Sequence, residues 1–289
     1  MLSPFQLLKK YKIQAKRGLG QNFLADINHL EKIVDAAEVG AADVVVEIGP
    51  GLGALSVPLA ERANQVVAVE VDPVMVSILN EEMTAHPNFQ VVEADILKVD
   101  PAQLLAERLT GFDLGDPYLV VANLPYYITS AIIQHLLEAS HPPQRVVITV
   151  QKEVAQRIVA KPGDMSILAV SVQFYGEATL CHTIPASAFV PPPKVDSAVV
   201  RIDLYDQPQV EIGRPADFFR VVKAGFSQKR KQLKNSLAAG LHRRQADVVD
   251  LMSSAGVDPT RRAETLSLPE WAALTKVLLP TSHSVDAVD

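Results

Sequence analysis

The sequence predicts an α/β domain built on a parallel sheet, followed by a small helical domain. Between residues 42 and 149, short runs rich in β-branched residues alternate with stretches of helical length. The runs are apolar enough for strands that are buried on both faces, and they cover residues 44–48, 66–71, 89–92, 118–122 and 145–149. The helical stretches between them cover residues 54–63, 73–85, 101–109 and 130–138.

The remaining residues complete the predicted architecture. Two more β-rich runs, residues 169–175 and 195–204, could extend the sheet as an antiparallel pair. After residue 207 the composition shifts to Lys, Arg, Ala and Leu with helical periodicity, interrupted by Gly and Pro. We therefore expect a first domain at 1–207 with a basic arm at 1–25, a small helical domain at 208–280 and a flexible tail at 281–289.

The distribution of charge points to an anionic partner although the total charge does not. A formal net charge of -6 argues against nucleic acid, because an anionic polymer is usually met by a surplus of Lys and Arg. Residues 1–25 nevertheless contain several basic residues and no acidic one, and so do residues 218–246. Two acid-free clusters favour contact with phosphates, and a solubilising surface is the alternative.

Length and composition restrict the class of protein further. The chain of 289 residues is 48% hydrophobic, enough for one large core and a smaller second one. It contains no apolar stretch of about 18 residues and no signal-peptide pattern. The single cysteine, Cys181, cannot form an internal disulfide and lacks the paired spacing of a zinc site. We expect a cytoplasmic protein without metal or membrane contact, and a monomer, because no hydrophobic stripe lacks a partner.

A glycine-rich turn follows the first predicted strand, in Val44-Val-Val-Glu-Ile-Gly49-Pro-Gly51-Leu-Gly53-Ala54. Glycines let the backbone come close to a ligand, and the N-terminus of the following helix offers free N–H groups. This arrangement indicates a nucleotide-like ligand. The loop alone does not identify it, because Gly49, Gly51 and Ala54 also satisfy the dinucleotide-binding pattern.

Acidic residues at the strand ends narrow the choice of ligand. Glu70 closes the second strand, where a carboxylate can accept both hydrogen bonds of a ribose diol. Asp95 closes the third strand. Its side chain can accept a hydrogen bond from an adenine amine, and capping of a helix is the alternative. Glu47, directly before the glycine loop, either clamps the loop or contacts the methionine amine of S-adenosylmethionine. The three acids together suit adenosine bound without a pyrophosphate.

The end of the fourth strand carries the candidate catalytic strip, Asn123-Leu124-Pro125-Tyr126. The exocyclic amine of adenine is a poor nucleophile because its lone pair is delocalised into the ring. The side-chain oxygen of Asn123 and the backbone carbonyl of Leu124 can each accept one N–H and turn the lone pair toward the methyl donor. Pro125 fixes the turn and adds no competing donor. No general base or metal is needed, because the methylated amine loses its proton to water.

Aromatic residues near the strip are candidates for holding the target base. Tyr126 can stack on an adenine that has left its own stack, whereas Tyr127 is expected in the core. Further on, a proline-stiffened loop presents Phe189 and Lys194. Phe189 could hold the base from the side opposite Tyr126, and packing under the loop is the alternative.

These residues resemble a known family, the small-subunit ribosomal RNA adenine N6-dimethyltransferases of the KsgA type. The resemblance spans most of the chain and rests on segments 20–24, 47–53, 123–126, 189–197 and 262–267, in the same order and spacing. One departure is an insert-like stretch at 111–117, which we interpret as a surface loop. The resemblance implies a Rossmann-like class I S-adenosylmethionine-dependent methyltransferase domain with a small C-terminal helical RNA-binding domain.

The resemblance also implies roles for individual residues. The methyl-donor pocket would be lined by Asn22, Leu24, Gly49, Gly51, Glu70, Asp95 and Asn123. RNA would be contacted by Lys194, Lys229, Arg230, Lys231 and Lys234. The implied substrate is a pair of adjacent adenines in the 3'-terminal hairpin loop of small-subunit ribosomal RNA, within the immature 30S subunit.

Other functions explain less of the sequence. The nearest alternative is a large-subunit ribosomal RNA adenine methyltransferase of the resistance type, and segments 189–197 and 262–267 favour the small subunit. A DNA adenine methyltransferase would need a separate base-reading domain larger than the residues after 204 provide. A nicotinamide oxidoreductase leaves segment 123–126 and the basic clusters unexplained. A noncatalytic ribosome-assembly factor would not need Asn123, Glu70 and Asp95 intact.

Overall fold

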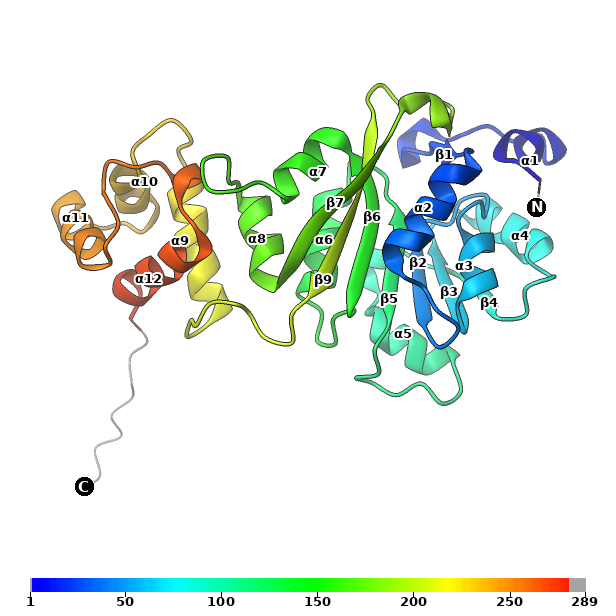
Figure 1. The fold of residues 1–289 in the computed structure, drawn as a ribbon, viewed down its shortest axis with the longest axis horizontal. Helices are drawn as coiled ribbons and strands as arrows, with labels where there is room; N and C mark the ends of the chain where they lie inside the picture. The colour runs from blue at the N-terminus through cyan, green and yellow to red at the C-terminus, as the bar shows by residue number, and fades with distance from the viewer. Residues whose placement is uncertain (1, 281–289) are drawn as a thin grey trace. The chain divides into compact units, whose positions relative to one another are not determined.

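The computed structural model describes residues 2–280, which fall into two compact units (Figure 1). Within these residues the first unit comprises 2–156 and 176–205, and the second comprises 157–175 and 206–280. Residues 157–175, which we assign to the first domain from the sequence, therefore belong to the second unit. The predicted flexible tail at 281–289 lies outside the described residues.

Within the described residues, a seven-stranded sheet forms the centre of the first unit. Its strand order is β4-β3-β2-β5-β6-β9-β7. The strands β2 (Val44–Ile48), β3 (Gln65–Glu70), β4 (Phe89–Glu93), β5 (Leu119–Asn123) and β6 (Arg145–Gln151) run parallel. All five predicted strands are thus confirmed. The strand order reverses between β2 and β5, so a crevice opens there at the carboxyl ends of the strands.

The two strands that complete the sheet are antiparallel to it. β9 (Ser197–Leu204) pairs with β6 on one side and with β7 (Gly176–Ile184) on the other. β9 confirms the predicted strand at 195–204. Its antiparallel partner is β7, so the prediction that residues 169–175 form this partner is wrong.

Residues 169–175 lie in the helix α8 (Ile167–Tyr175). A short apolar run of this length fits a buried strand and a buried helix equally well, so its periodicity does not decide between them. A local interaction favours the helix, because the Ser166 hydroxyl accepts a hydrogen bond from the Ala169 N–H at 3.2 Å in the first turn.

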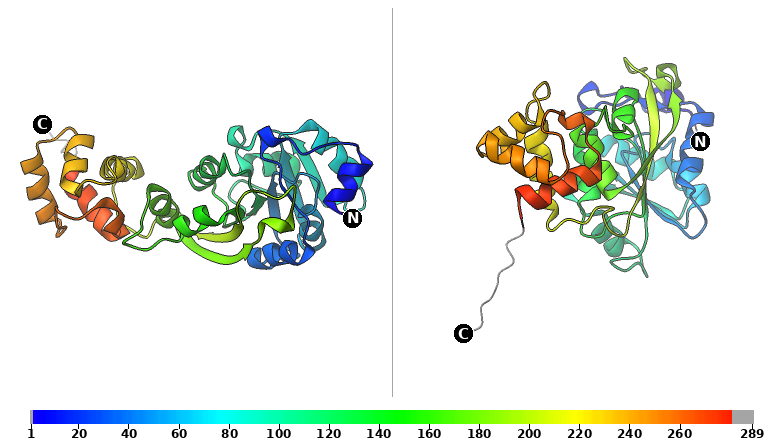
Figure 2. Two further views of the ribbon diagram at one scale, coloured as in Figure 1. Left: turned by 90° about the horizontal axis from the view of Figure 1, so that it is seen from above. Right: turned by 60° about the vertical axis from the view of Figure 1, so that its left-hand side comes forward.

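Helices cover both faces of the sheet (Figures 1 and 2). They are α2 (Ile27–Ala37), α3 (Ser56–Arg62), α4 (Pro73–Glu82), α5 (Pro101–Arg108) and α6 (Thr129–Leu137). The last four confirm the predicted helices. Asp26, Asp72 and Asp100 cap α2, α4 and α5, because each side chain accepts a backbone N–H of the first turn.

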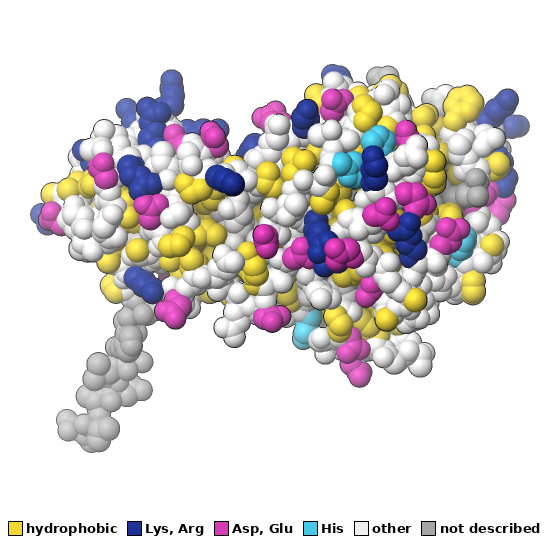
Figure 3. Space-filling view, in the orientation of Figure 1, with side chains coloured by type: hydrophobic (Ala, Val, Ile, Leu, Met, Phe, Trp, Pro, Cys, Tyr) yellow, Lys and Arg dark blue, Asp and Glu magenta, His cyan; other side chains and the backbone are white. Residues whose placement is uncertain are grey.

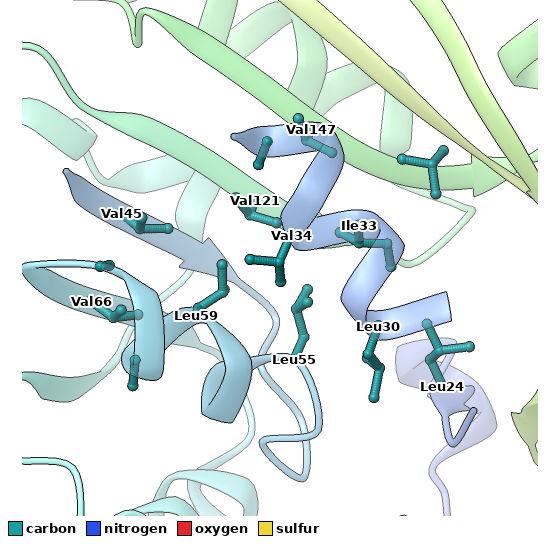
Figure 4. Packing of buried hydrophobic residues seen from close by; sticks show 14 of the residues in the cluster. Leu24, Leu30, Ile33, Val34, Val45, Leu55, Leu59, Val66, Val121 and Val147 are labelled. Carbon is teal, nitrogen blue, oxygen red and sulfur yellow. The ribbon is translucent and has the colours of Figure 1, made fainter. Parts of the chain in front are cut away.

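Aliphatic packing holds α2, α3 and α4 against one face of the sheet. In Figure 4, Val34 of α2 lies beside Val121 of the sheet, and Leu30 lies between Leu24 and Leu55. Ile33 and Val34 are fully buried. Because α2 follows directly after residues 20–24, this packing fixes the position of that segment beside the sheet.

The second unit has a helical core of its own. It combines α8 with α9 (Pro215–Phe226), α10 (Leu233–Gly240), α11 (Gln245–Ser254) and α12 (Leu268–Leu278). Phe174 and Phe218 stack with ring centroids 4.7 Å apart, and Trp271 is fully buried beside Phe226. None of the helices between residues 2 and 280 is long and apolar enough to cross a membrane.

Trp271 is the chain's single tryptophan, so its fluorescence reports on the second unit. Leu237→Ala removes a fully buried side chain from the cluster around Trp271. We expect this substitution to lower the free energy of unfolding, followed by the Trp271 fluorescence, by about 2–5 kcal/mol. The control Leu114→Ala changes a leucine of the first unit that is 52% exposed and should leave the transition in place. Equal stability of Leu237→Ala and the unaltered protein would contradict the packing.

Candidate active site

A cavity of about 360 Å³ lies at the carboxyl ends of the parallel strands. This volume is within the range of small-molecule sites, which starts near 300 Å³. Ten of the predicted site residues line the cavity: Asn22, Leu24, Gly49, Gly51, Glu70, Asp95, Asn123, Leu124, Pro125 and Tyr126. The structure therefore brings together residues from four strand ends and from the segment before α2.

The glycine loop between β2 and α3 has the backbone conformation that only glycine adopts easily. Gly49 and Gly51 have φ angles of 68° and 55°. A Cβ atom on Gly51 would come within 2.9 Å of the Phe23 ring, so packing also excludes a side chain there. At Gly49 no described atom lies within 4 Å of such a Cβ, so this glycine borders open space. Gly49 thus leaves room for a ligand, and Gly51 lets the loop pack on Phe23.

Glu70, at the end of β3, clamps this loop. Its carboxylate accepts the backbone N–H groups of Gly51 at 3.1 Å, Val71 at 2.9 Å and Asp72 at 2.9 Å. Burial raises the pKa of Glu70, and the three N–H groups oppose this rise. A carboxylate offers about four acceptor positions, so one is left for a ligand. Glu70 thus has room for a ribose hydroxyl while it holds the loop, and its contact with the ribose diol stays a prediction.

Glu47, at the end of β2, lacks a compensating partner. The residue is 1% exposed, and its Oε2 atom has no hydrogen-bond partner among the described residues. Burial raises its pKa to about 8, the nearby Ser56 hydroxyl opposes the rise, and the nearby Glu70 adds to it. Its place in the cavity lining leaves this oxygen available to a cationic or hydrogen-bond-donating ligand group.

Asp95 is a helix cap, which is one of the two interpretations that its sequence position allowed, and its contact with an adenine amine stays a prediction. It caps the short 3₁₀ helix Ile96–Lys98 by accepting the Leu97 N–H at 3.1 Å, and it also lines the cavity. The Lys98 ammonium lies 3.6 Å from the second carboxylate oxygen. Because 38% of the side chain is exposed, this second oxygen is accessible to a ligand.

The candidate catalytic strip, residues 123–126, is held by three sets of contacts. The side-chain amide of Asn123 donates to the Asn22 carbonyl at 3.2 Å. The Leu124 N–H donates to the Thr149 carbonyl at 3.2 Å. The Pro125 carbonyl accepts the Ile128 N–H and the Thr129 hydroxyl at 3.3 and 3.2 Å, which closes a tight turn. Since the amide nitrogen of Asn123 is engaged, its side-chain oxygen is the atom left to accept from a substrate.

Tyr126 is anchored on the strand that follows the proline loop. Its hydroxyl lies 2.6 Å from the hydroxyl of Ser197, which is fully buried at the start of β9. Burial raises the pKa of Tyr126, and the Ser197 contact opposes the rise. This anchor fixes the direction of the ring. Sequence reasoning missed Ser197, which lies in segment 189–197 and carried no signal of its own.

Two aromatic residues near the strip differ in their burial. Phe189 is 2% exposed, packs in the cluster with Leu24 and Leu30, and does not line the cavity. The strand β1 (Phe23–Leu24) pairs with β8 (Phe189–Val190), and Leu24 faces Phe189, which directs this ring into the core. This burial favours the alternative of packing under the loop, and contact of Phe189 with the base stays a prediction. Tyr127, expected in the core, is 63% exposed at the cavity. The turn at Pro125 places Tyr127 outside the sheet.

The basic arm is partly neutralised by contacts with α4 and its cap. Lys10 pairs with Glu81 and Glu82, and the Lys16 ammonium lies 2.9 Å from the buried Asp72. Burial alone would raise the pKa of Asp72, but hydrogen bonds from Lys16 and Gln21 lower it. These contacts, which the sequence did not reveal, hold the segment before Asn22 against the site.

The predicted RNA contacts of the second unit lie at its surface, and only Lys234 has an acidic neighbour, Asp258, among those that the electrostatics of the described residues show. Lys229, Arg230 and Lys231 are exposed in the segment between α9 and α10, and Lys234 is half-buried at the start of α10. None of the four is ion-paired within the described part of the chain. Lys and Arg side chains gather over this segment in Figure 3. In the first unit, Lys194 is exposed on the proline loop.

The fold and the site define the class of protein as a Rossmann-like class I S-adenosylmethionine-dependent methyltransferase. The chain belongs to the ribosomal RNA adenine dimethylase family, whose model matches residues 12–279. This finding confirms the resemblance inferred from the sequence.

Curated relatives and solved structures agree with this family. The chain is 45% identical over 272 residues to ribosomal RNA small subunit methyltransferase A of Dehalococcoides mccartyi, with 94% of this chain and 91% of the relative covered. The Bacillus mycoides protein of the same name is 42% identical, with 94% of both chains covered. The 23S rRNA methyltransferase ErmE superposes with a TM-score of 0.68 at 30% identity, covering 89% of this chain and 99% of ErmE.

A fourth comparison concerns the fold alone. A dimethyladenosine transferase from Plasmodium falciparum superposes with a TM-score of 0.72 at 24% identity, covering 87% of this chain and 95% of that chain.

The raised pKa of Glu47 makes a prediction about stability. Its pKa is about 8 in the folded chain against an ordinary value of 4.5, so the folded form holds more protons between these pH values. The stability that the protonated form provides is therefore lost as the pH rises toward 8. Glu47→Gln removes this loss. We therefore expect the Tm of Glu47→Gln minus that of the unaltered protein to increase as the pH rises from 5 to 8.

The control for this measurement is Glu61→Gln, which makes the same change at an exposed position of α3. Its difference in Tm from the unaltered protein should be constant over the same pH range. A Glu47→Gln difference that is equally constant would show that Glu47 is ionised alike in the folded and unfolded chains.

Proposed function

We propose that the protein transfers methyl groups from S-adenosylmethionine to N6 of two adjacent adenines in the 3'-terminal hairpin loop of small-subunit ribosomal RNA. The product is N6,N6-dimethyladenosine, formed during assembly of the 30S subunit. The observation that carries this proposal is the fixed amide of Asn123, whose oxygen is free in a cavity that also contains Gly49, Glu70 and Asp95.

The residues of the cavity fit the methyl donor. Open space at Gly49 gives room beside the backbone, and Glu70 keeps one acceptor position for a ribose hydroxyl. Asp95 offers an accessible oxygen to the adenine amine of the donor, and the orphaned Oε2 of Glu47 suits its amino group. When bound, S-adenosylmethionine supplies an electrophilic methyl group.

The chain's own residues prepare the target nitrogen. Asn123 Oδ1 and the Leu124 carbonyl each accept one N–H of the adenine amine, which favours the pyramidal nitrogen of the transition state. Tyr126, fixed through Ser197, stacks on the base after it leaves its own stack. Positioning and hydrogen bonding are sufficient, since the methylated amine gives its proton to water without a general base or metal.

The basic residues support an RNA substrate. Lys229, Arg230, Lys231 and Lys234 form no ion pairs among the described residues, so they are available to phosphates. Lys194 offers a further cation on the loop that leads to Ser197. The immature 30S subunit is the proposed partner, met in the cytoplasm by a monomer. The relatives named for the small subunit are 45% and 42% identical, against 30% for the large-subunit enzyme ErmE, which favours the small subunit.

One assay separates the proposed substrate from the alternatives. Tritiated S-adenosylmethionine is offered with unmethylated small-subunit particles, with large-subunit RNA and with duplex DNA. We expect label in the small-subunit particles, recovered as N6,N6-dimethyladenosine. Label only in large-subunit RNA or in DNA would refute the choice of substrate. Absence of label from all three would favour the noncatalytic assembly factor.

The role of Asn123 makes a second prediction. Asn123→Ala removes one of the two acceptors of the target amine, so we expect methyl transfer to fall by about 10²–10³-fold or more. Affinity for S-adenosylmethionine, measured by calorimetry, should stay within about tenfold, or roughly 1.4 kcal/mol. Asn64→Ala is the matched control, because Asn64 is exposed directly before β3. It therefore lies at the amino ends of the parallel strands, away from the cavity. Full activity of Asn123→Ala would remove the strip from the mechanism.

A further inference from the structure

Tyr127 has surroundings that differ from those of its neighbour Tyr126. Tyr126 is half-buried and anchored through Ser197, whereas Tyr127 is 63% exposed and still lines the cavity. Both belong to the turn that the Pro125 carbonyl closes. The turn therefore presents one tyrosine to the inside of the site and one to its mouth.

The Tyr127 ring has a support on one side. A Cβ atom on Gly20 would lie 3.4 Å from the ring atoms Cδ1 and Cε1, so the ring packs against the backbone of Gly20. Gly20 has a φ angle of 64°, and its neighbouring Gln21 is tied to the buried Asp72. Because this backbone is held in place, one side of the ring packs on a fixed support. The rest of the ring is exposed to solvent.

The proposed substrate supplies a group that would cover this surface. Two adenines are adjacent in the RNA, so when one enters the cavity the next base is held within one nucleotide of its mouth. An exposed aromatic ring is the side chain on which an unstacked base packs. Phe189, the other aromatic residue considered for such a contact, is buried in the core.

We propose that Tyr127 is a positioning residue on which the nucleotide next to the target adenine stacks. This inference rests on the proposed function and extends it to a second subsite of the same substrate. Stacking uses the face of a base and not its hydrogen-bonding edge, so the ring accepts the neighbouring adenine before and after methylation. One platform thereby serves both rounds of modification.

Steady-state kinetics on unmethylated small-subunit particles test the proposal. Tyr127→Ala should raise KM for the particles by about 5- to 150-fold, the loss expected for one stacked base. Affinity for S-adenosylmethionine should not change. Tyr127→Phe keeps the ring and should restore the KM. Leu114→Ala is the control, because Leu114 is 52% exposed in the loop before β5. This loop lies at the amino ends of the parallel strands, away from the cavity.

Each contrary outcome has a distinct meaning. An unchanged KM for Tyr127→Ala would overturn the proposal. A matching loss of S-adenosylmethionine affinity would make Tyr127 a cover of the donor instead, and an equal loss in Tyr127→Phe would assign the effect to the hydroxyl. Failure of the unaltered protein to methylate the particles would refute the proposed function and this inference with it.

Discussion

The Glu70 carboxylate makes the contacts on which the rest of the site depends. It accepts three backbone N–H groups at the end of β3 and so joins the glycine loop after β2 to the turn before α4. The two strands are neighbours in the sheet, and the loop occupies the point where the strand order reverses. Burial works against the charged form of Glu70, and only the convergence of these N–H groups opposes that effect.

A second constraint acts on the opposite side of the cavity. The Asn123 amide donates a hydrogen bond to the Asn22 carbonyl. Three contacts hold residues 20–24: Lys16 and Gln21 bind Asp72, the Phe23 ring packs against Gly51, and α2 follows the segment in the chain. The segment before α2 thus orients the Asn123 amide from outside the sheet. In the proposed function the cavity would select the base, and the exposed cations between α9 and α10 would meet phosphates.

The sequence predicted the parts of the fold that local patterns determine. Buried parallel strands consist of β-branched runs, and the acids and glycines at their ends could be placed at one edge of the sheet, where the structure finds them. Predictions failed where tertiary contacts decide. Residues 169–175 mix apolar residues with Ser171 and Gln173, and they form a helix that packs in the second unit. Phe189 is buried through the β1–β8 pairing, and Tyr127 is exposed because of the Pro125 turn. Asn22 and Ser197 act through distant partners, which no local pattern reveals.

We propose that the carboxyl ends of β2 to β5 bind the nucleoside of the methyl donor so that its reacting end faces Asn123. A crystal structure of the protein with S-adenosylhomocysteine tests this claim most directly. We expect a ribose hydroxyl on Glu70, the adenine amine on Asp95 and the thioether sulfur beside the side-chain oxygen of Asn123. A nucleoside bound away from these strand ends, or an Asn123 amide released from the Asn22 carbonyl, would contradict it.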